Sequence, residues 1–224
     1  MKKEDISGLI VYLIIIAFAI VFGLTVLQAH NAESTLNGIW YVLYIIGAVL
    51  VGAVFNAILF ELAHVVGAKI GKYEIVSVNI LGLCFYKEEG KRKVRFASFD
   101  GLTGETKIVP KDGMIEKANP YPYLFFGSLF FVAEAVAVMV VFSIFRHAEE
   151  LGLRDVAYAL LTVGAIGLVI LIYNILPMHI DSMTDGYRLT MVSNPKNKLA
   201  FNELLSLHYN TTLIQVKHFI FLIL

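Results

Sequence analysis

Residues 39–70 read IWYVLYIIGAVLVGAVFNAILFELAHVVGAKI, and no charged residue precedes Glu61 in this stretch. An apolar run of roughly 20 residues is long enough to cross the hydrocarbon core of a bilayer as a helix. No proline interrupts the pattern, so the helix is expected to continue past Glu61 and His64. The stretch therefore predicts a membrane span over residues 39–67, with a carboxylate and an imidazole at its end.

The composition agrees with a membrane protein and excludes a soluble domain. Hydrophobic residues make up 58% of the 224-residue chain, charged residues 16%, and the mean hydropathy is +0.74. A soluble domain of this length carries about 25% charged residues, because its surface must stay hydrated. The formal net charge of zero gives no indication of a nucleic-acid partner. The single cysteine, Cys84, excludes an internal disulfide framework.

Three further apolar runs extend the pattern. We expect spans at residues 6–27, 121–145 and 156–176. A cleaved signal peptide is the alternative for residues 6–27, but the run exceeds the usual apolar core of about 7–15 residues. The fold class expected is an α-helical polytopic membrane protein with about four transmembrane helices. Residues 1–210 would form a single membrane-embedded domain, and residues 211–224 a C-terminal tail.

Lysine and arginine set the expected orientation. They cluster in residues 69–117, between the second and third spans, whereas residues 28–38 contain none. Because positive residues favour the cytoplasmic side, both termini and the central stretch are predicted to be cytoplasmic. We expect an integral protein of a bacterial plasma membrane. The basic run at residues 91–93 would lie near anionic lipid headgroups.

The central stretch, residues 73–110, has the composition of a β-rich insertion rather than a helix. Residues 73–86 are rich in β-branched and aromatic side chains, and residues 94–99 alternate in polarity. Glu88, Glu89 and Gly90 form a turn signal between them. We therefore predict a cytoplasmic β-hairpin over residues 73–99, followed by a loop over residues 101–110.

Two polar clusters lie at the ends of spans, where ionisable residues are costly and are functional candidates. Glu61 and His64 end the second span, and Asn174 with Pro177 ends the fourth, shortly before Asp185. By the predicted topology both clusters lie at one membrane face, so they meet if these spans pack together. Structural alternatives exist: Glu61 and His64 as a simple hydrogen-bonded pair, and Asp185-Gly186 as a turn or helix N-cap.

These residues resemble a known family. Glu61-Leu62-Ala63-His64 is similar to the end of the His-Glu-x-x-His helix of site-2 proteases, which are intramembrane zinc metalloproteases. Asn174-x-x-Pro177 and the later Asp185-Gly186 resemble that family's second motif, and the resemblance covers residues 39–189. It implies that Glu61 is a general base and that His64 and Asp185 bind zinc. Asn174 would orient the substrate backbone or an oxyanion.

The resemblance also implies a substrate and a way of holding it. Substrates of the family are transmembrane helices that unwind locally to expose a peptide bond. An edge of the hairpin would hold the unwound segment by strand addition. The partners expected are therefore a transmembrane helix of another protein and the lipid bilayer.

The chain departs from the family at the position of the first metal-binding histidine. Phe60 stands there, and phenylalanine cannot bind zinc. The aspartate also lies farther from the proline, so residues 180–184 resemble an insertion. His179 or Asp181 would have to supply a substitute ligand.

Three functions remain open from the sequence. The first is a zinc protease with an altered ligand set, and the second is a pseudoprotease that binds a membrane helix without hydrolysis. The third is a transporter-associated subunit, in which Glu134 and His64 form a polar relay. Phe60 favours the pseudoprotease, whereas Glu61 favours the protease. The transporter ranks last, because the polar residues gather at one face instead of spreading through several spans.

Overall fold

The computed structural model describes residues 38–88, 90–98, 103–147, 151–178 and 183–221, together with scattered positions before residue 38. The predicted first span, residues 6–27, lies mostly outside the described residues; the described positions within it are helical. His179 and Asp181 lie outside them as well.

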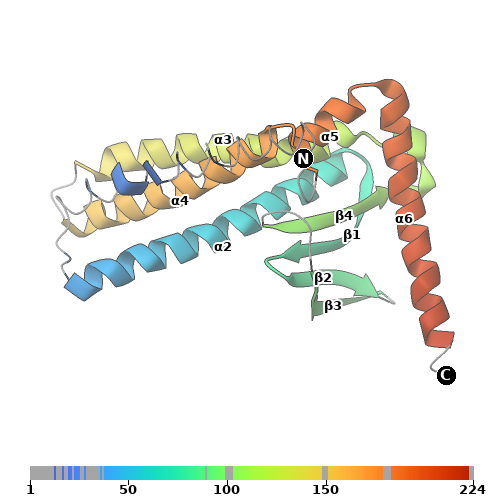
Figure 1. Cartoon of the computed structure of the whole chain (residues 1–224), viewed down its shortest axis with the longest axis horizontal. Helices are drawn as coiled ribbons and strands as arrows, with labels where there is room; N and C mark the ends of the chain where they lie inside the picture. The colour runs from blue at the N-terminus through green and yellow to red at the C-terminus, as the bar shows by residue number, and fades with distance from the viewer. Residues whose placement is uncertain are drawn as a thin grey trace.

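Three long helices lie side by side and form the body of the molecule (Figure 1). They are α2 (Gly38–Ile70), α3 (Pro120–Phe145) and α4 (Leu151–Ile175). Within the described residues, three helical stretches are long and apolar enough to cross a membrane: Gly38–Ile70, Ile115–Phe145 and Leu153–Ile175. They correspond to the spans expected at residues 39–67, 121–145 and 156–176. The chain is thus a membrane protein with a mostly helical fold.

A four-stranded antiparallel sheet lies beside the C-terminal end of α2 (Figure 1). Its strands are β1 (Tyr73–Ile80), β2 (Leu83–Glu88), β3 (Lys91–Phe96) and β4 (Gly104–Pro110), in the order β3-β2-β1-β4. The predicted hairpin is confirmed as β1 to β3, with Val78 opposite Phe85 and Phe85 opposite Val94.

The predicted loop over residues 101–110 is wrong, because it contains β4. This strand pairs with β1, with Ile108 opposite Ile75 and Thr106 opposite Val78. Thr106, Ile108 and Pro110 alternate into the interior while Lys107 is exposed, as in a half-buried strand. The glycine before the strand and the proline at its end are loop signals, and they obscured this short alternation.

The C-terminal part of the chain joins the helices to the sheet. Two short 3₁₀ turns, η1 (Lys111–Gly113) and η2 (Ile115–Lys117), lead from β4 to α3. After α4 come α5 (Asp185–Val192) and α6 (Pro195–Phe221). Tyr73 donates a hydrogen bond of 2.6 Å from its hydroxyl to Asn202 Oδ1 of α6. Burial raises the pKa of Tyr73, which keeps its hydroxyl protonated as a donor.

The helices α2 and α3 lie in close contact at one glycine of each helix, Gly67 of α2 and Gly127 of α3. A Cβ atom on Gly67 would lie 2.3 Å from the carbonyl oxygen of Pro122, and one on Gly127 would lie 2.5 Å from the ring of Phe60. Neither contact leaves room for a side chain. The two glycines therefore set how near α3 lies to the polar end of α2.

Replacing Gly67 with alanine is expected to destabilise the protein by about 1–3 kcal/mol, because the new methyl group meets backbone that cannot move aside easily. Gly47→Ala in the same helix is the matched control, since no atom lies within 4 Å of its Cβ position. Thermal unfolding in detergent compares the two variants. Equal midpoints for both would contradict the close approach.

Candidate functional site

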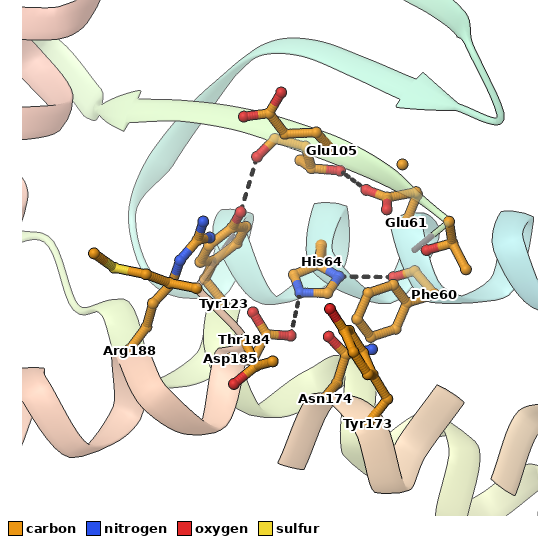
Figure 2. Close-up of a pocket in the computed structure, with 14 residues that line it drawn as sticks. Phe60, Glu61, His64, Glu105, Tyr123, Tyr173, Asn174, Thr184, Asp185 and Arg188 are labelled. Carbon is orange, nitrogen blue, oxygen red and sulfur yellow. Dashed lines mark hydrogen bonds and ion pairs between the residues drawn. The ribbon is translucent and has the colours of Figure 1, made fainter. Parts of the chain in front are cut away.

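The four residues singled out from the sequence line one pocket between α2, β4, α4 and α5 (Figure 2). Glu61 and His64 come from α2, Asn174 from α4 and Asp185 from the start of α5. The pocket has a volume of about 50 Å³. A water molecule needs roughly 10–15 Å³ by the same measure, so the pocket has room for a few of them.

His64 and Asp185 form a buried contact at the centre of the pocket. His64 Nε2 lies 3.0 Å from Asp185 Oδ2, and the residues are only 4% and 6% exposed. His64 Nδ1 lies 2.9 Å from the carbonyl oxygen of Phe60. Both ring nitrogens of His64 therefore face oxygen atoms. For both contacts to be hydrogen bonds, the His64–Asp185 pair must carry two protons, one for each contact.

Glu61 is turned toward the sheet rather than toward His64 (Figure 2). Its Oε2 accepts a hydrogen bond of 2.6 Å from Thr106 Oγ1 on β4, and Glu61 is only 2% exposed. The carbonyl oxygen of Thr106 in turn accepts one of 2.8 Å from the Tyr123 hydroxyl on α3. These bonds connect α3, β4 and α2 through one residue of the sheet.

Thr184 fixes the position of Asp185. It is the N-cap of α5, and its hydroxyl oxygen accepts hydrogen bonds from the backbone N–H of Tyr187 and of Met178, at 3.3 and 3.1 Å. Its hydroxyl also donates to the carbonyl oxygen of Leu176 at 2.6 Å. The sequence left an N-cap role open for Asp185-Gly186, but Thr184 has that role and Asp185 is the first residue of the helix.

Asn174 lies on the pocket wall, where its Nδ2 donates to the carbonyl oxygen of Ile170 at 3.1 Å. This bond ties the side chain to its own helix. Asn174 is 8% exposed, so its position beside the pocket gives it little contact with solvent.

Phe60 is built into the interior next to His64. The two rings meet edge to face with centroids 4.3 Å apart, and Phe60 stacks on Phe131 of α3 at 5.5 Å. Phe60 is 7% exposed. The side chain that replaces the expected histidine is thus part of an apolar layer that also contains Ile170.

Among the described residues, the pocket brings together two side chains that could bind zinc, His64 and Asp185. A catalytic zinc takes about three protein ligands and keeps one position for water. Within the described ranges, no group of three or more His, Cys, Asp or Glu side chains converges. His64 Nε2 and Asp185 Oδ2 lie 3.0 Å apart, so a zinc ion at this place would need a further ligand.

Sequence reasoning missed Thr106, Tyr123 and Thr184. The β-branched residues of 106–109 were the signal for Thr106, since they mark a strand once the flanking glycine and proline are treated as its ends. Thr184 directly before Asp185-Gly186 is an N-cap signal in its own right. Tyr123 carries no local signal, because its partner lies on a strand seventeen residues earlier.

Comparison of the chain with protein-family models, with curated proteins and with solved structures finds no match. The site is therefore interpreted from its own geometry.

The hydroxyl of Thr106 is expected to matter more than its size. Thr106→Val keeps the shape but removes the donor to a buried carboxyl group, which should lower the free energy of unfolding by about 1–3 kcal/mol. Thr106→Ser keeps the hydroxyl and should lose less. Chemical unfolding of the two variants in mixed micelles decides the order, and a valine variant as stable as the wild type would contradict the role of this bond.

Proposed function

We propose that this protein is a site-2-protease-like pseudoprotease, which binds a locally unwound segment of another protein's transmembrane helix without cleaving it. One observation carries the proposal. An edge strand, β4, forms a wall of the polar pocket, while Phe60 and the His64–Asp185 pair fill the place of a metal centre. The pocket thus keeps the means to hold an extended segment and lacks a zinc ligand set among the described residues.

Among the described strands, β4 lies at one edge of the sheet, and this position supports strand addition. The backbone N–H of Leu81 donates to the carbonyl oxygen of Thr103, so these residues form a hydrogen-bonded pair. Such pairs alternate with non-hydrogen-bonded ones in an antiparallel ladder. The backbone groups of Gly104 and Thr106 therefore point away from β1, and the carbonyl oxygen of Thr106 already accepts a hydrogen bond from the Tyr123 hydroxyl. An added strand would bind at Gly104, on the edge that lines the pocket, rather than on the hairpin edge expected from the sequence.

The lack of hydrolysis is supported by the state of each catalytic candidate. Glu61, the expected general base, is bound to Thr106. His64 has both ring nitrogens engaged, and Asp185 is its partner. We place the pocket at the cytoplasmic side of a plasma membrane, on the strength of the lysine and arginine distribution.

A zinc protease with an altered ligand set is the second candidate. It is favoured by the 3.0 Å separation of His64 Nε2 and Asp185 Oδ2, which brings two possible ligands together, and by Glu61 lining the same pocket. This candidate requires a third donor from His179 or Asp181, which lie outside the described residues.

Metal content separates the two candidates. Purified wild-type protein supplied with zinc is expected to hold far less than one equivalent, and Phe60→His should raise the content because it adds the missing donor. Phe60→Leu is the control for loss of the ring alone. Elemental analysis after gel filtration makes the measurement. Stoichiometric zinc in the wild type, lost in Asp185→Ala, would overturn the pseudoprotease.

Binding to β4 is tested with model transmembrane peptides in nanodiscs. In a Cys84→Ser background, Glu105→Cys on β4 should form a disulfide with a single-cysteine peptide whose helix is interrupted by glycine and proline. An uninterrupted leucine-alanine peptide should cross-link much less, because its backbone groups are already paired. Lys87→Cys, on β2, is the position control. Equal cross-linking at both positions would contradict recognition by the edge strand.

A further inference from the structure

A second polar cluster lies inside the helix bundle, separated from the pocket by an apolar layer. It consists of Asn56 of α2, Glu134 of α3 and Gly167 of α4, and we call it the three-helix cluster. The layer of Phe60, Phe131 and Ile170 stands between it and His64. Glu134 lies near the middle of α3, the part of a span where a carboxyl group is least tolerated.

Gly167 provides the room in which the other two side chains meet. The point where its Cβ would stand lies 2.6 Å from Glu134 Oε2 and 2.7 Å from Asn56 Oδ1. Any larger residue at this position would displace both oxygens. Two side-chain oxygens from different helices therefore face one another across a glycine of a third.

The amide of Asn56 is fixed by its own donors. Asn56 Nδ2 donates to the carbonyl oxygen of Gly52 at 2.8 Å and to that of Val163 on α4 at 2.9 Å. Both amide hydrogens are used, so the identity of the other atom as Oδ1 is set. Asn56 is fully buried.

The cluster is short of hydrogen-bond donors. Among the residues that the structure describes, Asn56 Oδ1 and both carboxyl oxygens of Glu134 are buried and have no hydrogen-bond donor. Buried polar atoms without partners are rare, because each costs the desolvation of the group. If Glu134 were a carboxylate, its oxygens and Asn56 Oδ1 would all be hydrogen-bond acceptors. A neutral carboxyl group of Glu134 supplies a donor to Asn56 Oδ1.

The surrounding helices present no charge that could stabilise a carboxylate. Residues 45–60 of α2, residues 159–172 of α4 and the rest of residues 124–145 of α3 contain no titratable side chain. The nearest titratable groups along these helices lie beyond those stretches: Tyr44 and Glu61 on α2, Tyr158 and Tyr173 on α4, and Tyr123 and Arg146 at the ends of α3.

We propose that Glu134 is a proton-binding site, whose neutral carboxyl group donates a hydrogen bond to Asn56 Oδ1. Binding takes one proton from water and converts the carboxylate to the acid, with no other bond made or broken. The resulting chain of hydrogen bonds runs from Glu134 on α3 through Asn56 on α2 to Val163 on α4. Loss of the proton breaks this chain beneath Phe60 and Phe131, so the floor of the pocket responds to protonation. The inference does not depend on the proposed function.

The state of the carboxyl group is tested directly by infrared spectroscopy of the full chain in nanodiscs. Wild type at neutral pH should show the C=O stretch of a protonated, hydrogen-bonded carboxyl group that shifts in D₂O, and Glu134→Gln should lack it. Asn56→Leu should move the band to higher frequency, because the acceptor is gone. A wild type without this band, and with an added carboxylate signal, would overturn the proposal.

Reactivity and stability give a second, independent test. Dicyclohexylcarbodiimide, an apolar reagent that adds to protonated carboxyl groups, should label Glu134 in wild type, as mapped by mass spectrometry. Protection by sodium would instead indicate a cation site and overturn the proposal. Because the folded state binds the proton better than the unfolded state, wild-type stability should fall as the pH rises. Glu134→Gln keeps a hydrogen-bond donor at this position but cannot titrate, so it should remove this pH dependence of the stability. A pH profile unchanged from that of the wild type would contradict the proposal.

Discussion

The close approach of α2 and α3 at Gly67 and Gly127 decides where the polar groups of the pocket lie. With no side chain at either glycine, the backbone of α3 reaches α2 at Pro122, and the rings of Phe60 and His64 lie against Gly127. The same approach brings the ring of Tyr123 to 5.0 Å from that of His64 and its hydroxyl to the carbonyl oxygen of Thr106. Packing of two apolar helices therefore also attaches the sheet, because β4 is held by a side chain of α3.

Within this frame, Glu61 and His64 are each paired with a residue of another element. Glu61 bonds to the sheet and His64 bonds to α5, so removing either partner leaves a group in an environment where water cannot replace it. A site organised in this way is well suited to holding its own shape. The three-helix cluster follows the same rule once Glu134 carries a proton.

The sequence predicted those features that depend on hydropathy and on local spacing. Three spans were predictable because runs of apolar residues have one stable arrangement in a bilayer, and Glu61 and His64 lie one helical turn apart. That Glu61 and His64 lie near Asp185 was predicted by placing both polar clusters at one membrane face. The partner of Glu61 was not predictable, since Thr106 lies on a strand flanked by loop signals. The orientation of the Phe60 ring depends on Gly127, whose role appears only when α3 is in place.

The hydrogen bonds of Thr184 fix the position of Asp185 close to the end of α4. Thr184 is tied to Met178 through the backbone, N–H to carbonyl oxygen at 3.1 Å, and to Leu176 through its hydroxyl. A Cβ on Gly186 would lie 2.1 Å from the carbonyl oxygen of Ile175, which leaves α5 no freedom to shift along α4. Asp185 is thus positioned by its two neighbours in the sequence, Thr184 and Gly186, which hold the start of α5 against the end of α4.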